Sequence, residues 1–520
     1  DEQAASIEEY DALDEAKLVV YKAGFYKGTM LVGKYAGRSV EYAKPLVRED
    51  LLASGDACIY FEPESVVMSR TGNECVISCE DQWYLTYGAP KWKEIIENHV
   101  ASENFTLYNA ETERDFKNAL GWLKEWGCAR QFGLGTQIPF EESLVVESLS
   151  DSTIYMAYYT IAHQLQGEGN LFSDDVGPCG AAPSAFNNDV WSAIFLKKEY
   201  VETPTTVPAA IVAKLRAEFE YWYPMDLRVS GKDLIKNHLT MSLYNHAAIW
   251  NESPEMWPRA MFTNGFVKVD NEKMSKSLGN FMSLKEAVEA FSADATRLAL
   301  ASAGDSLEDA NFERPLALKA IGNLSDELEW IAAHLAPSAA LRTSEKTFAD
   351  SVIINDISYS MEETKIAYEG MRYAVAVKEA FYGMRSIRNH YARICETSGI
   401  ALHEDCVKTW ISAFVAAIAP ICPHFSEHCW SSAELLNAEG SIFNCATGGG
   451  WPTLAAVDPV LKQSSQYIQF NSAELRSKMQ NALSPKKKGG KKKKGKKGKA
   501  APAPAPAADA AAAAPPAPPT

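Results

Sequence analysis

The sequence predicts an α/β domain followed by an all-α domain and a low-complexity tail, and three observations lead to this architecture. Residues 58–314 alternate short β-rich runs, such as ECVIS and GFVKV, with glycine turns and helical stretches, which is typical of α/β folds. Residues 315–484 have an almost wholly helical pattern. Residues 485–520 consist of lysine-glycine and alanine-proline runs that cannot bury a core, so we predict that they are disordered.

The helical pattern is clearest near the middle of the all-α domain. One stripe of apolar residues recurs at helical spacing: Trp410, Ile411, Phe414, Val415 and Ile418. Residues at this spacing share one face of a helix. We therefore predict a helix that packs this face into a bundle.

Residues 1–57 differ from both domains. GTMLVGKY has the pattern of a strand and KPLVREDLLASGDA that of a helix, so we predict the end of a further domain. GTMLVGKY also has the glycine spacing and lysine of a P-loop, but Tyr35 stands where a small hydroxyl must reach Mg²⁺. We expect Met30, Leu31 and Val32 to form a buried strand instead.

Composition limits the class of protein. The 520 residues are 47% apolar, which is enough for two or more domains with proper cores. The ten cysteines lack the tight, even spacing of a secreted disulfide scaffold, and nothing resembles a signal peptide. The longest apolar runs fall short of the ~20 residues that span a bilayer. We predict a soluble, cytoplasmic protein with no membrane partner.

Charge is unevenly distributed along the chain. The formal net charge is −16, yet residues 486–520 carry ten lysines and one aspartate, which leaves −25 for the rest. An acidic body argues against indiscriminate nucleic-acid binding, so a polyanion must be held at local basic patches. The lysine run is either a solvated linker or an arm that adds affinity for RNA phosphates, and these interpretations are compatible.

Two cysteine-containing stretches could suggest zinc. CPHFSEHCW places Cys422, His424, His428 and Cys429 close together, but the ligand-pair spacing C-x₂₋₄-C is missing. We favour a helix-turn-helix corner there over a metal site. ECVISCE is more simply a strand with both thiols on one face than half of a metal site, so no bound metal is predicted.

The stretch NEKMSKSLGN, residues 271–280, is the strongest chemical motif. Lys273 and Lys276 are three residues apart, Gly279 allows a turn, and the amphipathic MSLKEAVEAF follows as a helix. Flexible ammonium groups on a loop can stabilise negative charge that develops on leaving phosphates. Short lysine-serine runs also occur as plain exposed loops, so the motif alone leaves both interpretations open.

The surrounding sequence resembles a known family. KMSKS is the second signature of class I aminoacyl-tRNA synthetases, and residues 1–484 are similar to leucyl-tRNA synthetases of the cytosolic eukaryotic and archaeal type. The similarity is carried, in the order of that family, by these stretches: SRTGNECVI, DQWYLTYG, GWLKEWGCARQFGLGTQIPF, ESLSDSTIYMAYYTIAHQL, YPMDLRVSGKDLIKNHL, EKMSKSLGNF, FSADATRLALA and APICPHFSEHCW. Several long matches in one order make the resemblance specific.

The resemblance implies a fold and an activity. The expected fold is the second half of a Rossmann-like class I synthetase catalytic domain (58–314), then an all-α anticodon-binding helical bundle (315–484) and a disordered tail (485–520), with residues 1–57 ending an inserted editing domain. The expected activity is that of a leucine–tRNA ligase, which uses ATP and Mg²⁺ to activate leucine and transfers it to tRNA-Leu. Synthetases for isoleucine, valine or methionine are a lesser alternative.

Site residues follow from the same resemblance. It assigns ATP binding to Ser230, Gly231, Asp233, Lys273 and Lys276, with the two lysines as catalytic residues that hold ATP phosphates. It assigns leucine binding to the following three residues: Ser152, Tyr155 and His238. For each of these residues taken singly, ordinary packing is the alternative.

A tRNA-binding face is expected on MRSIRNHYARI. This stretch places Arg385, Arg388, Tyr391 and Arg393 along one helix, a mixture of charge and aromatic surface suited to an RNA backbone. A solvated basic face is the equal alternative. A multi-synthetase complex is a further partner that the resemblance allows.

The sequence also departs from the family. Its first signature, two histidines that flank a residue and a glycine, is absent, since no two of the nine histidines are three residues apart. We expect the chain to be the C-terminal part of such an enzyme, without the editing site and with doubtful activity alone. The alternative is a catalytically inactive tRNA-binding or scaffold protein.

Overall fold

The chain forms two compact units in the computed structural model. One contains residues 1–85 and 127–131, and the other contains 86–126 and all residues after 131. The structure describes the following residues, apart from the side chains of 7–15 and 481: 7–69, 72–78, 81–167, 175–275, 279–432, 435–436, 438–444 and 450–483. The predicted disordered tail and Lys276 lie outside this part of the chain.

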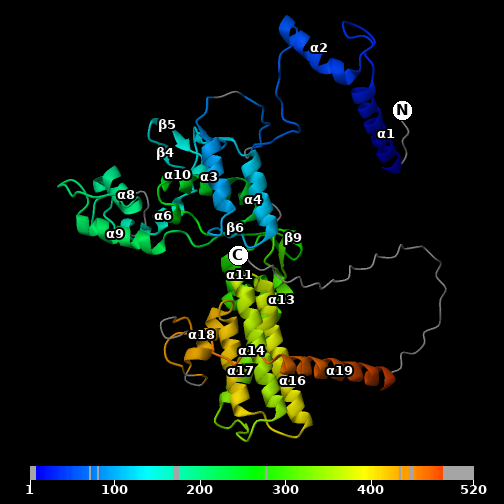
Figure 1. The fold of residues 1–520 in the computed structure, drawn as a ribbon, viewed down its shortest axis with the longest axis vertical. Coiled ribbons are helices and arrows are strands. Elements are labelled where there is room, and N and C mark those ends of the chain that lie inside the picture. Colours follow the sequence, from blue (N-terminus) through cyan, green and yellow to red (C-terminus); the bar gives the residue numbers. More distant parts are fainter. Residues whose placement is uncertain are drawn as a thin grey trace, which may run out of the picture. The chain divides into compact units, whose positions relative to one another are not determined.

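The first unit contains two helices, α1 (Ile7–Lys27) and α2 (Val40–Ser54) (Figure 1). The side chain of Ser39 accepts a hydrogen bond from the backbone N–H of Tyr42 (3.4 Å) and caps the start of α2. Gly55 ends the helix with φ +77°, a conformation that glycine adopts without strain. The predicted helix over KPLVREDLLASGDA is therefore confirmed.

The strand predicted for GTMLVGKY does not form. Residues 31–37 make a turn, and only a single bridge joins Thr29 to Ser39. Leu31 and Val32 are 87% and 77% exposed instead of buried. Apolar, β-branched residues favour a strand only where a neighbouring strand can cover them, and the described part of this unit offers none here.

The strand predicted for ECVISCE is also wrong where it can be examined. Met68 and Glu74 form one isolated antiparallel bridge, and Cys75 lies in an irregular segment. Cys79 lies outside the described residues. The short strands near this region and beyond it are β1 (Tyr84–Thr86), β2 (Glu125–Gly127), β3 (Ala129–Arg130), β4 (Gln137–Ile138) and β5 (Glu141–Val146).

The α/β part of the second unit is built on two parallel strands, β6 (Arg228–Gly231) and β7 (Met261–Asn264). Ser230 pairs with Thr263 in their register. Helices α3 (Pro90–Val100), α4 (Ala110–Trp122) and α10 (Thr240–Ile249) pack against one another in the same part. The buried hydroxyls of Thr112 and Thr263 are hydrogen-bonded at 2.7 Å, which ties α4 to β7.

A second small sheet follows in the chain. Strands β8 (Val267–Val269) and β9 (Glu272–Lys273) form an antiparallel hairpin, and β10 (Ala310–Phe312) pairs parallel to β8. Helices α11 (Leu284–Phe291) and α12 (Ala293–Ala303) follow the hairpin. The strand predicted for GFVKV is thus confirmed as β8, and the predicted helix after KMSKS is α11.

Short helices complete the α/β part. They are α5 (Ser148–Asp151), α6 (Tyr155–Tyr159), α7 (Ala162–Leu165), η1 (Pro183–Ala185), α8 (Asn188–Phe195), α9 (Ala209–Trp222), η2 (Lys232–Leu234), η3 (Ile235–Leu239) and η4 (Pro254–Met256). Together with α10, the last of these helices connect β6 to β7. This connection brings η3 and α4 into contact.

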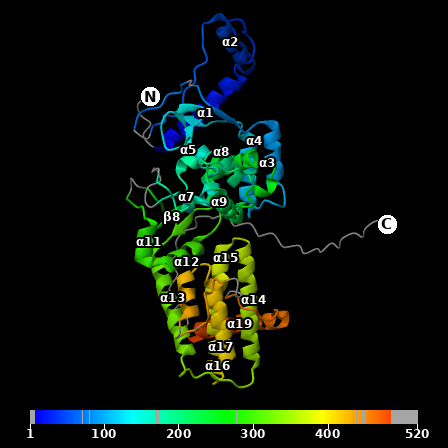
Figure 2. The same ribbon diagram turned by 90° about the vertical axis from the view of Figure 1, so that its left-hand side faces the viewer.

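The helical bundle has long helices lying side by side (Figures 1 and 2). Its elements are α13 (Arg314–Leu335), α14 (Phe348–Glu369), α15 (Tyr373–Val377), η5 (Lys378–Gly383), α16 (Met384–Thr397), α17 (Glu404–Ile418), α18 (Pro423–Ser431) and α19 (Pro459–Leu483). The predicted apolar stripe of Trp410 lies on α17 and is buried in the bundle core, as expected.

Helix α12 is tied to the bundle at the corner between α17 and α18. Arg297 donates hydrogen bonds to the carbonyls of Pro420 and Ile421, each at 2.8 Å. The carboxylate of Asp294 accepts from the backbone N–H of Phe425 at 2.6 Å and lies 3.0 Å from Nδ1 of His424. The predicted helix-turn-helix corner is thus confirmed. Its backbone groups and His424 are hydrogen-bonded to Arg297 and Asp294 of α12.

The described residues contain neither a metal-binding cluster nor a membrane-spanning helix. No group of three or more histidine, cysteine, aspartate or glutamate residues there could hold a metal ion. No helix in the same residues is long and apolar enough to cross a bilayer.

Candidate functional site

The carboxyl end of β6 presents three of the predicted ATP-binding residues. Ser230 and Gly231 end the strand, and Asp233 follows in η2 with an exposed side chain. A Cβ at Gly231 would lie only 2.7 Å from Oδ1 of Asp233, so a larger residue would displace this carboxylate. Ligands of α/β folds bind at the carboxyl ends of parallel strands, which is where these groups lie.

Asp309 organises the basic side chains at this edge. Its carboxylate accepts a hydrogen bond from Lys232 at 2.7 Å and lies 3.4 Å from Nζ of Lys268. Lys232 also donates to the carbonyl of Leu307 at 2.9 Å. The bond from Lys232, followed by a backbone N–H, holds the pKa of Asp309 at about 2. Two of the lysines at this edge therefore share one carboxylate.

Lys273 is placed differently from these two lysines. It ends β9, is exposed, and forms no ion pair with any described carboxylate. Its ammonium group lies 5.1 Å from the ring centre of Phe266. A cation without a carboxylate partner at a strand edge is suited to bind phosphate. The structure does not describe Lys276, so its role stays a prediction.

Asn280 holds the residues that flank the undescribed part of the loop. Its side-chain oxygen accepts from the backbone N–H of Ser275 at 2.8 Å, and its Nδ2 donates to the carbonyl of Lys273 at 3.0 Å. Ser283 and Glu286 then form a capping box that starts α11. Asn280 is part of the NEKMSKSLGN motif, yet the motif alone predicted no role for it.

The three predicted leucine-binding residues lie in one region. The imidazole Nε2 of His238 is 3.0 Å from the carbonyl of Ser152. His238 is buried, and this burial lowers its pKa, so the ring is neutral near pH 7. If Nε2 carries the proton and donates to Ser152, Nδ1 is a buried acceptor without a protein partner.

Arg228 adds a residue that the sequence analysis missed. Its guanidinium lies 5.0 Å from the ring centre of Tyr155 and donates to the hydroxyl of that residue. Because Arg228 begins β6 and Ser230 lies two residues later, both point to the same face of the strand. The strand therefore connects the predicted leucine-binding and ATP-binding residues.

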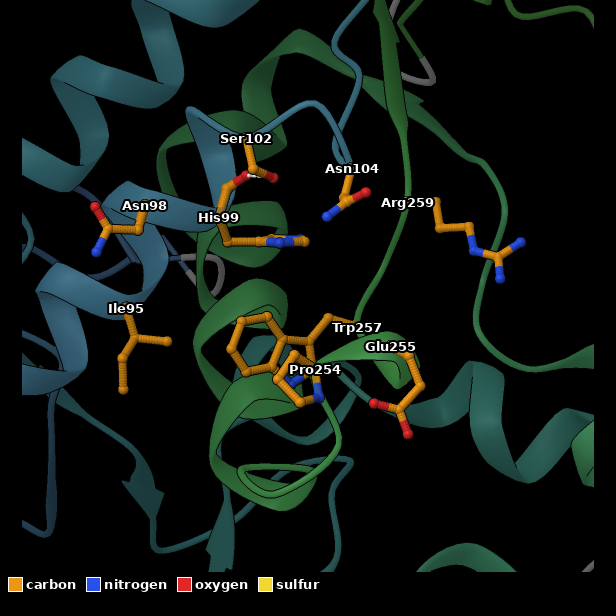
Figure 3. A pocket seen from close by; sticks show the side chains of 9 residues that line it. All are labelled: Ile95, Asn98, His99, Ser102, Asn104, Pro254, Glu255, Trp257 and Arg259. Atoms are coloured by element: carbon orange, nitrogen blue, oxygen red, sulfur yellow. Dashed lines mark hydrogen bonds between the residues drawn. The ribbon is translucent and has the colours of Figure 1, made fainter.

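A pocket of about 830 Å³ lies elsewhere in the second unit. It is formed by α3, the loop after it and the segment before β7, and none of the predicted site residues lines it (Figure 3). His99 and Trp257 meet edge to face, at 5.2 Å between ring centres. This pocket is at the amino end of β7, whereas Gly231 lies at the carboxyl end of the paired strand.

For Arg388 the structure corrects the predicted tRNA-binding face. Its side chain is 9% exposed, pairs with buried Glu327, and stacks against Trp330 and Trp410. Tyr391 is also buried, and its hydroxyl bonds to Asp350. Both side chains turn inward because α16 packs that face against α13, α14 and α17.

Arg393 instead lines a groove between α16 and α19 with a volume of about 440 Å³. Arg385 also lines this groove, but its guanidinium pairs with Glu327 at 2.6 Å. Arg476 of α19 adds a third guanidinium. Burial, followed by the charge of nearby Arg393, lowers the pKa of His390 in the same groove. The other lining residues are uncharged: Tyr382, Ser386, Asn389, Gln469, Ser472 and Ala473. The groove is thus a basic surface with amide and aromatic groups, and we name it the α16–α19 groove.

Two family models match the chain. "tRNA synthetases class I (C) catalytic domain" matches residues 213–314, and "Anticodon-binding domain of tRNA ligase" matches residues 350–496. A cytoplasmic leucine–tRNA ligase of Arabidopsis thaliana is 42% identical over 475 residues, which are 91% of this chain and 42% of that protein. One of Pongo abelii is 41% identical over 478 residues, with 92% and 40% covered. The chain belongs to the leucyl-tRNA synthetase family.

This member of the leucyl-tRNA synthetase family spans about two fifths of the length of these relatives. Its fold is similar to that of the Mycobacterium tuberculosis methionyl-tRNA synthetase in complex with methionyl-adenylate. The TM-score is 0.50 at 17% identity, over 70% of this chain and 65% of that chain. The class I catalytic fold and the anticodon-binding helical fold are therefore both present in the chain.

Proposed function

We propose that the chain provides the second half of the Rossmann-like catalytic domain and the anticodon-binding bundle of a cytoplasmic leucine–tRNA ligase. The observation that carries this proposal is the position of Lys273. It is an exposed cation beside the carboxyl end of β6, inside the segment that matches the class I catalytic model. Leucine, ATP and tRNA-Leu are the proposed substrates.

ATP is proposed to bind at the carboxyl end of β6. Gly231 lets the backbone approach the adenosine, and the exposed Asp233 accepts hydrogen bonds from the ribose hydroxyls. Lys273, together with Lys276, stabilises the negative charge that grows on the leaving pyrophosphate when the leucine carboxylate attacks the α-phosphate. Mg²⁺ would enter as part of the substrate, bound to the phosphates of ATP.

Leucine is proposed to bind beside Ser152, Tyr155 and His238. Neutral His238 can offer an uncharged nitrogen at Nδ1, and Tyr155 is held in place by Arg228. A mainly apolar pocket with a few fixed polar groups suits an aliphatic amino acid. Since Arg228 and Ser230 share a face of β6, the amino acid would lie close to the proposed ATP edge.

The tRNA is proposed to contact the α16–α19 groove through its phosphates. Arg385, Arg393 and Arg476 line the groove, and no carboxylate belongs to its described lining. Helix α19 is held against α14, because the hydroxyl of Ser465 donates to Asp356 at 2.5 Å. This anchoring places Arg476 opposite α16. The proposed contacts in the groove are to tRNA phosphates, and no base-specific recognition is proposed.

The decisive test is leucine-dependent exchange of labelled pyrophosphate into ATP. It should be measured on this chain and on the longest product of its gene, with isoleucine, valine and methionine as control substrates. Exchange that requires leucine in either protein supports the proposal. If neither protein shows leucine-dependent exchange but tRNA binding is retained, the alternative of a catalytically inactive tRNA-binding protein is favoured.

A further inference from the structure

The ring of Phe266 lies close to two ammonium groups at the proposed ATP edge. Nζ of Lys232 is 5.4 Å from the ring centre, and Nζ of Lys273 is 5.1 Å from it. Both distances fall within the ~6 Å over which a cation is attracted to an aromatic ring. Lys232 follows β6 and Lys273 ends β9, so one ring contacts cations from two separate segments.

The two lysines differ in how firmly they are held. Lys232 donates to Asp309 at 2.7 Å and to the carbonyl of Leu307 at 2.9 Å. Lys273 has the ring of Phe266 as its contact and pairs with none of the described carboxylates. Lys232 is therefore fixed, whereas Lys273 can leave the ring without breaking an ion pair.

The backbone that carries Phe266 is fixed as well. Its N–H donates to Asp309 at 3.1 Å, and the neighbouring N–H of Gly265 donates to the carbonyl of Ser306 at 3.0 Å. A Cβ at Gly265 would lie 2.1 Å from the carbonyl oxygen of Glu308. Only glycine allows this approach, which fixes the base of the ring while leaving the side chain 38% exposed.

We propose that Phe266 is a positioning residue whose ring holds the ammonium group of Lys273 at the strand edge until the phosphates of ATP take it over. This inference rests on the proposed function of that edge. An exposed cation–π contact shifts an equilibrium by only about two- to five-fold, so phosphate can displace it. Holding a flexible lysine near its place of action reduces the ordering that the reaction still requires.

The contact between Lys273 and the ring of Phe266 can be tested even if the chain has no enzymatic activity. Reductive methylation with ¹³C-formaldehyde keeps the charge of lysine and adds methyl groups that NMR detects, and Lys273→Arg identifies the signal of Lys273. The ring should shift this signal away from that of exposed lysines. Phe266→Leu should abolish the shift and Phe266→Tyr should keep it. A signal that is the same with and without the ring would overturn the inference.

Adding ATP with Mg²⁺ to the methylated chain tests the transfer to phosphate. The Lys273 signal should move away from its ring-shifted position in the parent protein. A signal that stays ring-shifted when ATP is bound would contradict the proposed transfer, even if the contact with Phe266 exists. ATP that does not bind at all would instead count against the proposed function of the edge.

Kinetics then test the effect on the reaction. In pyrophosphate exchange, Phe266→Leu should lower kcat by about two- to five-fold, with the KM for leucine unchanged, and Phe266→Tyr should remain near the parent rate. The matched control is Phe348→Leu, an exposed phenylalanine at the start of α14, which should have no effect. An active enzyme that is indifferent to Phe266→Leu would refute the positioning role.

Discussion

A carboxylate shared by basic side chains occurs both at the strand edge and inside the helical bundle, but with opposite accessibility. Asp309 bonds Lys232 and Lys268 at the surface, where the side chains of both lysines are about one third exposed. Glu327 bonds Arg385 and Arg388 in the bundle and is 1% exposed. Water and salt screen the first cluster, while the second cannot lose a partner without leaving a buried charge.

The comparison teaches that burial decides the role of a basic residue. At the strand edge, exposed lysines remain able to exchange a protein partner for a phosphate. In the bundle, Arg388 is committed to Glu327 and to the faces of two tryptophans, so it serves the fold. The following predictions test this difference, beginning with the largest expected effect.

Glu327→Gln should destabilise the bundle by about 3–5 kcal/mol, because Arg388 would keep its buried charge without a carboxylate. Urea unfolding followed by circular dichroism measures the free energy of unfolding. Asp309→Asn is the matched change at the strand edge and should cost clearly less, since its lysine partners can reach water. Equal losses in the free energy of unfolding of the two variants would contradict the proposed difference between the buried and the exposed carboxylate.

Lys273→Ala and Lys276→Ala should each slow leucine activation by ~10²-fold, as the loss of a group that stabilises developing charge does. The free energy of unfolding of Lys273→Ala should stay at the parent value because exposed Lys273 pairs with no described carboxylate. Pyrophosphate exchange measures the rate, and Lys285→Ala on α11 is the control, since Lys285 is 83% exposed and pairs only along its own helix. An unchanged rate in both loop variants would show that the loop lysines do not contribute to leucine activation.

The stability of the bundle should fall in acid through Asp350. Burial alone would raise the pKa of this carboxyl, but hydrogen bonds from Arg342, Tyr391 and Thr347 outweigh it and hold the pKa at about 2. The unfolded chain therefore binds this proton first, and about 2 kcal/mol of stability is lost as the pH falls from ~4 towards ~2.

Comparison of the parent with Asp350→Asn isolates this loss. The difference between their free energies of unfolding should shrink over the same pH interval. The pKa of Asp309 is also about 2, but added salt should weaken its contribution and leave that of buried Asp350 nearly unchanged. A difference that does not depend on pH would contradict the assignment to Asp350.

The smallest effect is expected at the α16–α19 groove. Arg393→Gln and Arg476→Gln should each weaken tRNA binding and lower the slope of log affinity against log salt by about 1. Filter binding over a salt series measures this slope. Arg216→Gln, a surface arginine of α9 that pairs with Glu220, should leave it unchanged. A loss that is the same at every salt concentration would indicate a contact other than phosphate.

Sequence reasoning found the features that local spacing encodes. The helix after the lysine loop and the apolar stripe of Trp410 both follow from patterns within a few residues, whereas the site at Ser230 and Gly231, which end β6, was implied by the family resemblance. Asp309 and Glu327 were missed because their partners Lys232 and Arg388 are 77 and 61 residues away. No local pattern marks a carboxylate whose role depends on such a distant contact.

The tRNA-binding prediction failed in part for a geometric reason. Arg388 and Arg393 lie on the same helix, five residues apart, so their side chains point in directions about 140° apart at 3.6 residues per turn. The sequence shows that both are basic but not which face of α16 the bundle covers. The predicted strand at Leu31 failed similarly, because strand formation needs a neighbouring strand that the composition of the segment cannot reveal.

The bonds from α12 to the corner between α17 and α18 matter for anyone who builds hybrid enzymes from relatives. Arg297 and Asp294 belong to the segment that matches the catalytic model, whereas Ile421 and Phe425 belong to the segment that matches the anticodon-binding model. A graft that joins the two parts from different species must therefore bring a compatible corner along with the bundle. Without it, Asp294 would keep a largely buried carboxylate with no backbone donor.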